Sequence, residues 1–285
     1  MIELLFKPNS VERKPFHMFF IGILYSLVSV ALVSLIFAKD SVLADYGGLL
    51  VVIFSVISAT PFMYYLIKLE EGKDIEITKS GKLLKEHSKA IKAMMWLFLG
   101  MVIGFSISYI LLPSYNDVNF NAQIKVFCAI NNPSNYDNCL VEKGMPSITG
   151  NAASKGMYLL SIFANNVYVL IFTLLFSLLM GAGAMFILVW NASVIAVAIG
   201  VFTKGAITKL PLALARYMIH GIPEISAYFI AALAGGIVSV AVIRKDLEGQ
   251  GKWKILEDAI LLIIVAVIIL FFSALIEVYV SHAIF

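Results

Sequence analysis

Three residues that can carry charge or exchange a proton stand together at the edge of an otherwise apolar run. Arg216, His220 and Glu224 fall within the stretch RYMIHGIPEISAYFIAALAGG, residues 216–236. Arginine is a permanent cation, histidine titrates near neutral pH, and a carboxylate can accept a proton. Ionisable side chains in apolar membrane segments are rare and often functional. This stretch is therefore the first candidate for a functional site.

Pro223 indicates how the chain presents these groups. Proline fixes φ and lacks an N–H, so it disrupts a helix interior but suits the first position of a helix. We therefore predict a helix from Pro223 to Ile243, with Glu224 facing the unpaired N–H groups of its first turn. Three interpretations stay open: a brace in which Glu224 pairs with Arg216 or His220, a proton or ion site, and a site for a lipid headgroup or partner.

Three amides lie inside other apolar runs. Asn165 and Asn166 fall in residues 156–180, and Asn191 falls in residues 182–202. An unpaired amide in hydrocarbon costs roughly 4–8 kcal/mol, so these side chains must face protein or trapped water. They either join helices or line a polar cavity. Gly181, in the turn MGAGAM, allows the tight reversal between the two runs.

Composition sets the class of protein that holds these groups. Of 285 residues, 61% are hydrophobic and 14% are charged, with a mean hydropathy of +0.94. Soluble domains have about 25% charged residues. We predict an all-α, polytopic membrane bundle of about seven helices, at residues 16–38, 47–66, 93–112, 156–180, 182–202, 223–243 and 259–279. Residues 206–219 are expected to be interfacial or re-entrant.

Lysines and arginines predict the orientation. Three precede the first span, seven lie between the second and third, and four follow the sixth. The positive-inside rule places these fourteen in the cytoplasm, although Lys204, Lys209 and Arg216 then lie outside. We expect a multi-pass protein of the cell membrane with a cytoplasmic N-terminus and an extracytoplasmic C-terminus.

The two longest loops have different characters. Residues 113–155 are expected outside and hold both cysteines, Cys128 and Cys139, which favours a disulfide over two free thiols. Residues 75–92 are basic, and we expect either an amphipathic helix on the inner leaflet or a solvated linker. The chain then divides into an N-terminal hairpin with its linker, 1–92, and a five-helix core, 93–285.

Small residues predict close helix packing. Small residues recur every four positions in the sixth span, at Ala227, Ala231, Gly235 and Ser239. The fifth span has Gly200 near its end. Small residues at this spacing let helix backbones approach in lipid. The pattern leaves open whether the contact is internal or joins copies of the chain into a homo-oligomer.

Enzyme signatures are missing from the sequence. It has no HExxH, GxSxG or GxxxxGK[ST] motif, and its four histidines are dispersed. We therefore expect a non-enzymatic protein with no catalytic residues, metal or cofactor, and the composition gives no support for nucleic acid binding.

The stretches 163–200 and 219–236 together resemble the stage II sporulation protein M family. The paired Asn, the Gly bend, the Asn–small–x–Gly helix and the His-Gly-x-x-Glu segment match at Asn165, Asn166, Gly181, Asn191, Gly200, His220, Gly221, Glu224, Gly235 and Gly236. Ile219 replaces a usual proline, and the first hairpin looks like an addition to a five-span core.

The resemblance implies a membrane scaffold that recruits partners rather than an enzyme. We expect contacts with the bilayer and with proteins at the external loop or membrane face. The alternative is a transporter or channel that uses the polar residues for ion, proton or small-solute passage, as buried polar groups on broken helices do in many transporters.

Overall fold

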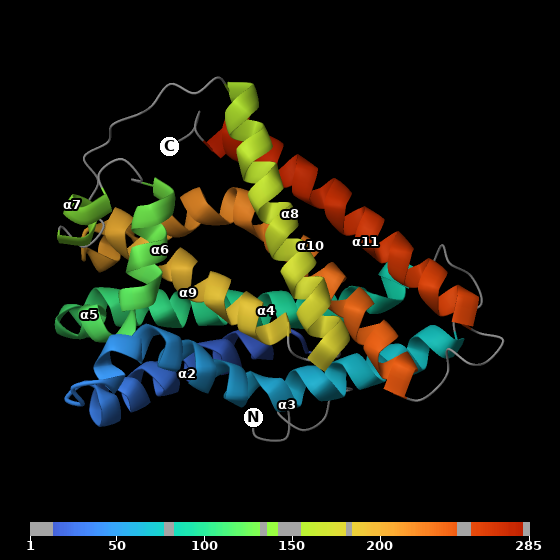
Figure 1. The fold of residues 1–285 in the computed structure, drawn as a ribbon, viewed down its shortest axis with the longest axis horizontal. Helices are drawn as coiled ribbons and strands as arrows, with labels where there is room; N and C mark the ends of the chain where they lie inside the picture. The colour runs from blue at the N-terminus through green and yellow to red at the C-terminus, as the bar shows by residue number, and fades with distance from the viewer. Residues whose placement is uncertain are drawn as a thin grey trace.

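The computed structural model describes residues 14–76, 83–131, 136–141, 155–180, 184–243 and 252–281. Every regular element within these ranges is helical (Figure 1). The long helices are α2 (His17–Leu32), α3 (Gly47–Glu76), α4 (Leu83–Leu111), α8 (Lys155–Met180), α9 (Ala184–Thr203), α10 (Leu210–Ile243) and α11 (Lys252–Leu275). The shorter ones are η2 (Val33–Phe37), η3 (Leu43–Tyr46), η5 (Pro113–Tyr115), α5 (Asn116–Asn119), α6 (Asn121–Asn131), α7 (Tyr136–Val141), η7 (Ile207–Lys209) and η9 (Ile276–Ser281).

Within the described ranges, seven helical segments are long and apolar enough to cross a membrane, which confirms the predicted polytopic bundle. They run over His17–Phe37, Leu43–Leu66, Ser88–Leu111, Leu159–Leu178, Ala184–Thr203, Ile207–Ile243 and Trp253–Ser281. At about 1.5 Å per residue, each reaches the roughly 30 Å of a hydrocarbon core.

Helix α10 lies at the centre of the bundle. In its most apolar window 82% of residues are buried, against 17% for the span of α8 and 33% for that of α11. It packs against α3, α4, α8, α9 and α11. The outer helices present large apolar side chains outward, among them Leu35, Tyr168, Ile264 and Phe272. Such a surface is suited to lipid and not to water.

The sixth span begins earlier than predicted. Pro223 lies inside α10, which starts at Leu210, and the expected re-entrant segment forms η7 and the first turns of this helix. Proline removes one N–H donor, but neighbouring helices can stabilise the interrupted turn within a membrane bundle. The 34 residues of α10 extend about 51 Å, so this helix is tilted or continues beyond the hydrocarbon core.

The basic stretch at residues 75–92 also differs from expectation. Its described parts extend the neighbouring spans: Ile75 and Glu76 end α3, and Leu83 begins α4. Near the end of this stretch Ala90 is buried, while Lys89 and Lys92 are exposed. In its described part, residues 83–92, the stretch therefore belongs to the helix of the third span, and residues 77–82 lie outside the described residues.

The first hairpin packs directly into the remainder of the bundle. A Cβ added to Gly22 of α2 would collide with the Leu97 carbonyl of α4, and one added to Gly100 would collide with the Phe19 carbonyl. Backbones this close exclude every larger residue from both positions. The first hairpin is therefore in close backbone contact with the third span.

Helices α5, α6 and α7 form a cap at one end of the bundle, the left end in Figure 1. Cys128 of α6 and Cys139 of α7 form a disulfide, with Cα atoms 5.7 Å apart. The Gln123 amide donates to the Gly48 carbonyl at 2.9 Å and to Ser193 Oγ at 3.1 Å. The cap is thereby tied to α3 and α9 by buried hydrogen bonds.

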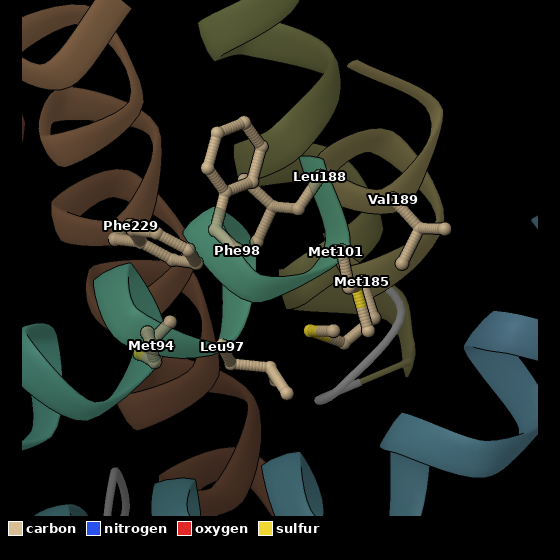
Figure 2. A pocket seen from close by; sticks show the side chains of 8 residues that line it. All are labelled: Met94, Leu97, Phe98, Met101, Met185, Leu188, Val189 and Phe229. Carbon is tan, nitrogen blue, oxygen red and sulfur yellow. The ribbon is translucent and has the colours of Figure 1, made fainter. Parts of the chain in front are cut away.

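One small pocket lies between α4, α9 and α10 (Figure 2). Its lining is apolar throughout: Met94, Leu97, Phe98, Met101, Met185, Leu188, Val189 and Phe229. Small apolar cavities of this kind stay dry. The pocket offers a polar solute no hydrogen bond, so the polar groups of the bundle must be sought elsewhere.

Candidate functional site

Glu224 is the centre of a polar cluster within the spanning helices. It lies in the middle of α10, one turn before Tyr228, whose hydroxyl donates to Glu224 Oε1 at 2.9 Å. Tyr228 is fully buried. Residues four apart on a helix share a face, so α10 itself aligns the donor with the carboxylate. A hydroxyl bond to a charged acceptor contributes about 1.5–3 kcal/mol.

Asn166 of α8 brings a second donor to the same carboxylate. Its side chain lies against Glu224 and is only 5% exposed. The Nδ2 atom of Asn166 lies beside the Glu224 carboxylate without meeting strict hydrogen-bond geometry to any group among the described residues. An unsatisfied buried donor costs about 1–3 kcal/mol. The amide is thus placed to donate to any acceptor that gains negative charge beside it.

Glu277 of η9 supplies a second carboxylate, which our sequence analysis missed. It lies close enough to Glu224 to interact electrostatically with it. The signal was present, since Glu277 is an acid within the last apolar run, LIEVYV. Segment η9 is a π-helix, a distortion that often marks functional sites.

His220 fastens α10 to this same π-helix. Its Nδ1 forms a 3.0 Å hydrogen bond with Ser281 Oγ, and its backbone carbonyl accepts a 2.8 Å bond from Ser273 Oγ. Helices α10 and α11 run antiparallel (Figure 1). His220 therefore connects α10 both to η9 and to α11.

Arg216 has a different contact from the one anticipated. Its guanidinium lies over the ring of Phe202 in α9, 5.1 Å from the centroid. The hydrogen bond that Glu224 accepts comes from Tyr228 and not from Arg216 or His220. The brace between Glu224 and Arg216 or His220 stays a prediction.

Asn165 and Asn191 do not contact the Glu224 carboxylate in the way that Asn166 does. Asn165 is exposed on α8, and its Nδ2 is 3.5 Å from Asn166 Oδ1. Asn191 donates to the Ile187 carbonyl of its own helix at 2.7 Å. Of the three amides, Asn166 is the one that faces the carboxylate.

Comparison with protein families identifies the chain. The family model for stage II sporulation protein M matches residues 16–282. The chain belongs to the stage II sporulation protein M family. No curated protein and no solved structure matched this chain. The match includes the first two spans. The first hairpin, expected to be an addition to a five-span core, therefore lies within the family region.

The small residues that we predicted for helix packing lie inside this bundle. Ala227 and Ala231 are fully buried, and Ser239 is 5% exposed. A Cβ on Gly235 would lie 2.9 Å from the Leu174 carbonyl oxygen of α8, where Ser177 Oγ donates to the Ala232 carbonyl. Gly200 lies against the Tyr109 ring. Gly181, the predicted tight turn, lies outside the described residues.

The acidic groups of this family member do not assemble a recognisable metal centre. Among the residues that the structure describes, no three His, Cys, Asp or Glu side chains come together in a metal-binding group. What the cluster offers is two carboxylates, a tyrosine hydroxyl and an amide from α8, α10 and η9. Such an arrangement can hold and exchange protons.

Proposed function

We propose that this chain is a non-enzymatic membrane scaffold that recruits a protein partner through the cap formed by α5–α7. The observation that carries the proposal is the cross-linking of the cap. The Cys128–Cys139 disulfide joins two of its helices, and hydrogen bonds join it to the bundle. A surface that is already ordered loses little conformational entropy on binding, so its contacts translate more fully into affinity.

Two side-chain amides order this surface. Asn121 Oδ1 accepts the Gly48 N–H at 3.2 Å, and Asn121 Nδ2 donates to the Asp45 carbonyl. Asn119 Nδ2 donates to Ser34 Oγ at 2.7 Å. These bonds join the cap to both helices of the first hairpin, which would give a recruited partner a fixed position relative to the membrane.

The cap also presents apolar side chains outward. Ile130 of α6 is 65% exposed and Val141 of α7 is 81% exposed. Apolar side chains flanked by polar residues are common at the cores of protein interfaces. We propose that these residues face the outside of the cell membrane, with the N-terminus in the cytoplasm and the C-terminus outside.

Photo-crosslinking in native membranes tests the scaffold. A photoreactive amino acid at Val141 samples the cap, and the matched control is Leu35 of η2, which is 83% exposed on the first span. We expect discrete protein adducts from position 141 and lipid adducts alone from position 35. Identical adduct patterns from the two positions would exclude recruitment through the cap.

A second candidate is the movement of protons or a cation across the bilayer, and the proximity of Glu224 to Glu277 favours it. Liposomes containing the protein and a pH-sensitive dye would test it with a panel of cations. Transport predicts flux that Glu224→Gln abolishes and that Glu257→Gln, at an exposed acid on α11, leaves intact. Absence of flux in the wild type would remove this candidate for the ions tested.

A further inference from the structure

Helix α8 carries an exposed amide close to the middle of its membrane span. Asn165 is exposed, whereas its neighbour Asn166 is buried against the bundle. The apolar span of α8 runs over Leu159–Leu178, so Asn165 lies about 5 Å along the helix from its midpoint, at about 1.5 Å per residue. A hydrocarbon core is about 30 Å thick, which places this amide well inside it.

An amide at this depth requires a hydrogen-bond partner, because lipid chains offer neither donors nor acceptors. Within the described residues, the bond of the Asn165 side chain runs from its Nδ2 to Asn166 Oδ1, at 3.5 Å. A bond of that length is weak. It leaves the carbonyl oxygen of Asn165 and one of its two N–H groups to be satisfied from outside the chain.

The exposed face around Asn165 has the spacing of a helix-pairing seam. Helix α8 lies on the outside of the bundle and is the least buried of the seven spans (Figure 1). Exposed residues follow one another along it at alternating steps of four and three: Ser161, Asn165, Tyr168, Phe172 and Leu175. This alternation is the pattern by which two helices pack side by side, and one Asn in such a seam fixes register and the number of helices.

The other outer helices lack such a polar group at mid-span. Where the structure describes α2 and α11, the side chains exposed near the middle of each span are apolar, among them Leu24, Leu27, Ile264 and Ile268. Lipid chains cover side chains of this kind without penalty. The face of α8 therefore differs from them in requiring a partner that can form hydrogen bonds.

A second copy of this chain meets that requirement. Two copies inserted in the same orientation are related by a two-fold axis along the membrane normal, so each residue of α8 lies at the same depth as its equivalent. Asn165 then faces Asn165 of the second copy, and two amides can exchange hydrogen bonds because each both donates and accepts. We propose that α8 is a homodimer interface, in which the seam from Ser161 to Leu175 packs against its equivalent and the paired Asn165 amides set the register.

The dimer goes beyond the proposed scaffold function and does not depend on it, because its residues lie on α8 and not on the cap. Bonds between helices in membranes contribute less than a lone amide in hydrocarbon costs, since separated helices find other partners. Two such bonds across the seam correspond to about a tenfold change in the dimer dissociation constant.

Photo-crosslinking of the full chain in native membranes tests the interface. A photoreactive phenylalanine analogue at Phe172 samples the seam, and the matched control is the same analogue at Phe272 of α11; these two phenylalanines are 54% and 57% exposed. We expect an adduct of two copies of this chain from position 172 and lipid adducts alone from position 272. Lipid adducts alone from position 172, or an adduct there with a different protein, would overturn the proposal.

Variants at Asn165 test the role of the amide. Single-molecule photobleaching in vesicles over a range of protein-to-lipid ratios measures the dimer dissociation constant. Asn165→Leu should raise this constant about tenfold, whereas Asn165→Gln, which retains the amide, and Phe272→Leu, which lies off the seam, should leave it near the wild-type value. An unchanged constant in Asn165→Leu would overturn the pairing. Crosslinking from position 172 retains Asn165, so it decides on the interface even if Asn165→Leu fails to fold.

Discussion

The Cα of Gly22 in α2 lies 3.1 Å from the position that a Cβ would occupy on Gly100 of α4. Two helix backbones are therefore in direct contact, and the first hairpin is held to the third span by close packing. Contacts of this kind replace water-driven association in lipid, where helices gain little from burying apolar surface.

Gly100→Ala should separate α2 from α4 and destabilise the protein by about 1–3 kcal/mol, as overpacking does elsewhere. The added methyl would meet the Phe19 carbonyl, which is backbone and cannot rotate away. Thermal unfolding in detergent measures the effect. Gly156→Ala is the control, since nothing lies within 4 Å of its Cβ position, and alanine there should be neutral or stabilising by up to about 1 kcal/mol. Equal losses at both sites would contradict the interpretation.

Gly200→Ala should lower the free energy of unfolding by a similar amount, about 1–3 kcal/mol. The added methyl on α9 would collide with the Tyr109 ring of α4. Tyr109 is a side chain, so a smaller residue should relieve the collision. The double variant Gly200→Ala/Tyr109→Leu is expected to lose less stability than the sum of the two single changes. Strict additivity would show that the two residues do not meet.

Gln123→Ala should loosen the cap. The change removes two buried hydrogen bonds and leaves the Gly48 carbonyl without its donor, which costs about 2 kcal/mol. Hydrogen exchange of α6 and α7 should accelerate while exchange in α10 stays unchanged. Lys125→Ala, on the exposed side of α6, should leave all three rates at the wild-type level. A cap whose exchange does not respond to Gln123→Ala would not be anchored by this bond.

Loss of the disulfide should destabilise the cap without unfolding the bundle. Cys128 and Cys139 are 11 residues apart, and closing a loop of this size stabilises a fold by about 2–4 kcal/mol. Thiol labelling of unreduced, denatured protein should give no reaction, and labelling after reduction should modify both cysteines. Cys128→Ser/Cys139→Ser should lower the crosslinking yield from Val141. Two reactive thiols in the unreduced protein would rule out the bond.

Epitope tags inserted at Lys79 and Asn135, two positions outside the described residues, should be accessible from opposite sides of the membrane. Seven spans place the loop that holds Lys79 in the cytoplasm and the loop that holds Asn135 outside, as the lysine distribution requires. Antibody access before and after permeabilisation measures this. Access from the same side for both tags would contradict seven spans with an inward N-terminus.

The positions of the spans could be predicted because hydropathy is a local property of the chain. Runs of about 20 apolar residues have few alternatives to a membrane helix, since each unpaired backbone group in lipid is costly. Pro223 misled the prediction for the same local reason. A proline signals a helix start when its surroundings are unknown, whereas here neighbouring helices bury α10 on both sides of the proline and keep it continuous.

The sequence by itself determined the class, the number of spans and the family resemblance, and it singled out Glu224, Asn166 and Gly235 as candidates. Each of these follows from residue type and spacing within one segment. Only the tertiary structure decided which groups lie close together: Glu277 near Glu224, Ser281 against His220, and Phe202 against Arg216. These partners lie on different helices, and their contacts depend on helix rotation and tilt, which are set by packing across the bundle and leave no periodic signal along the chain.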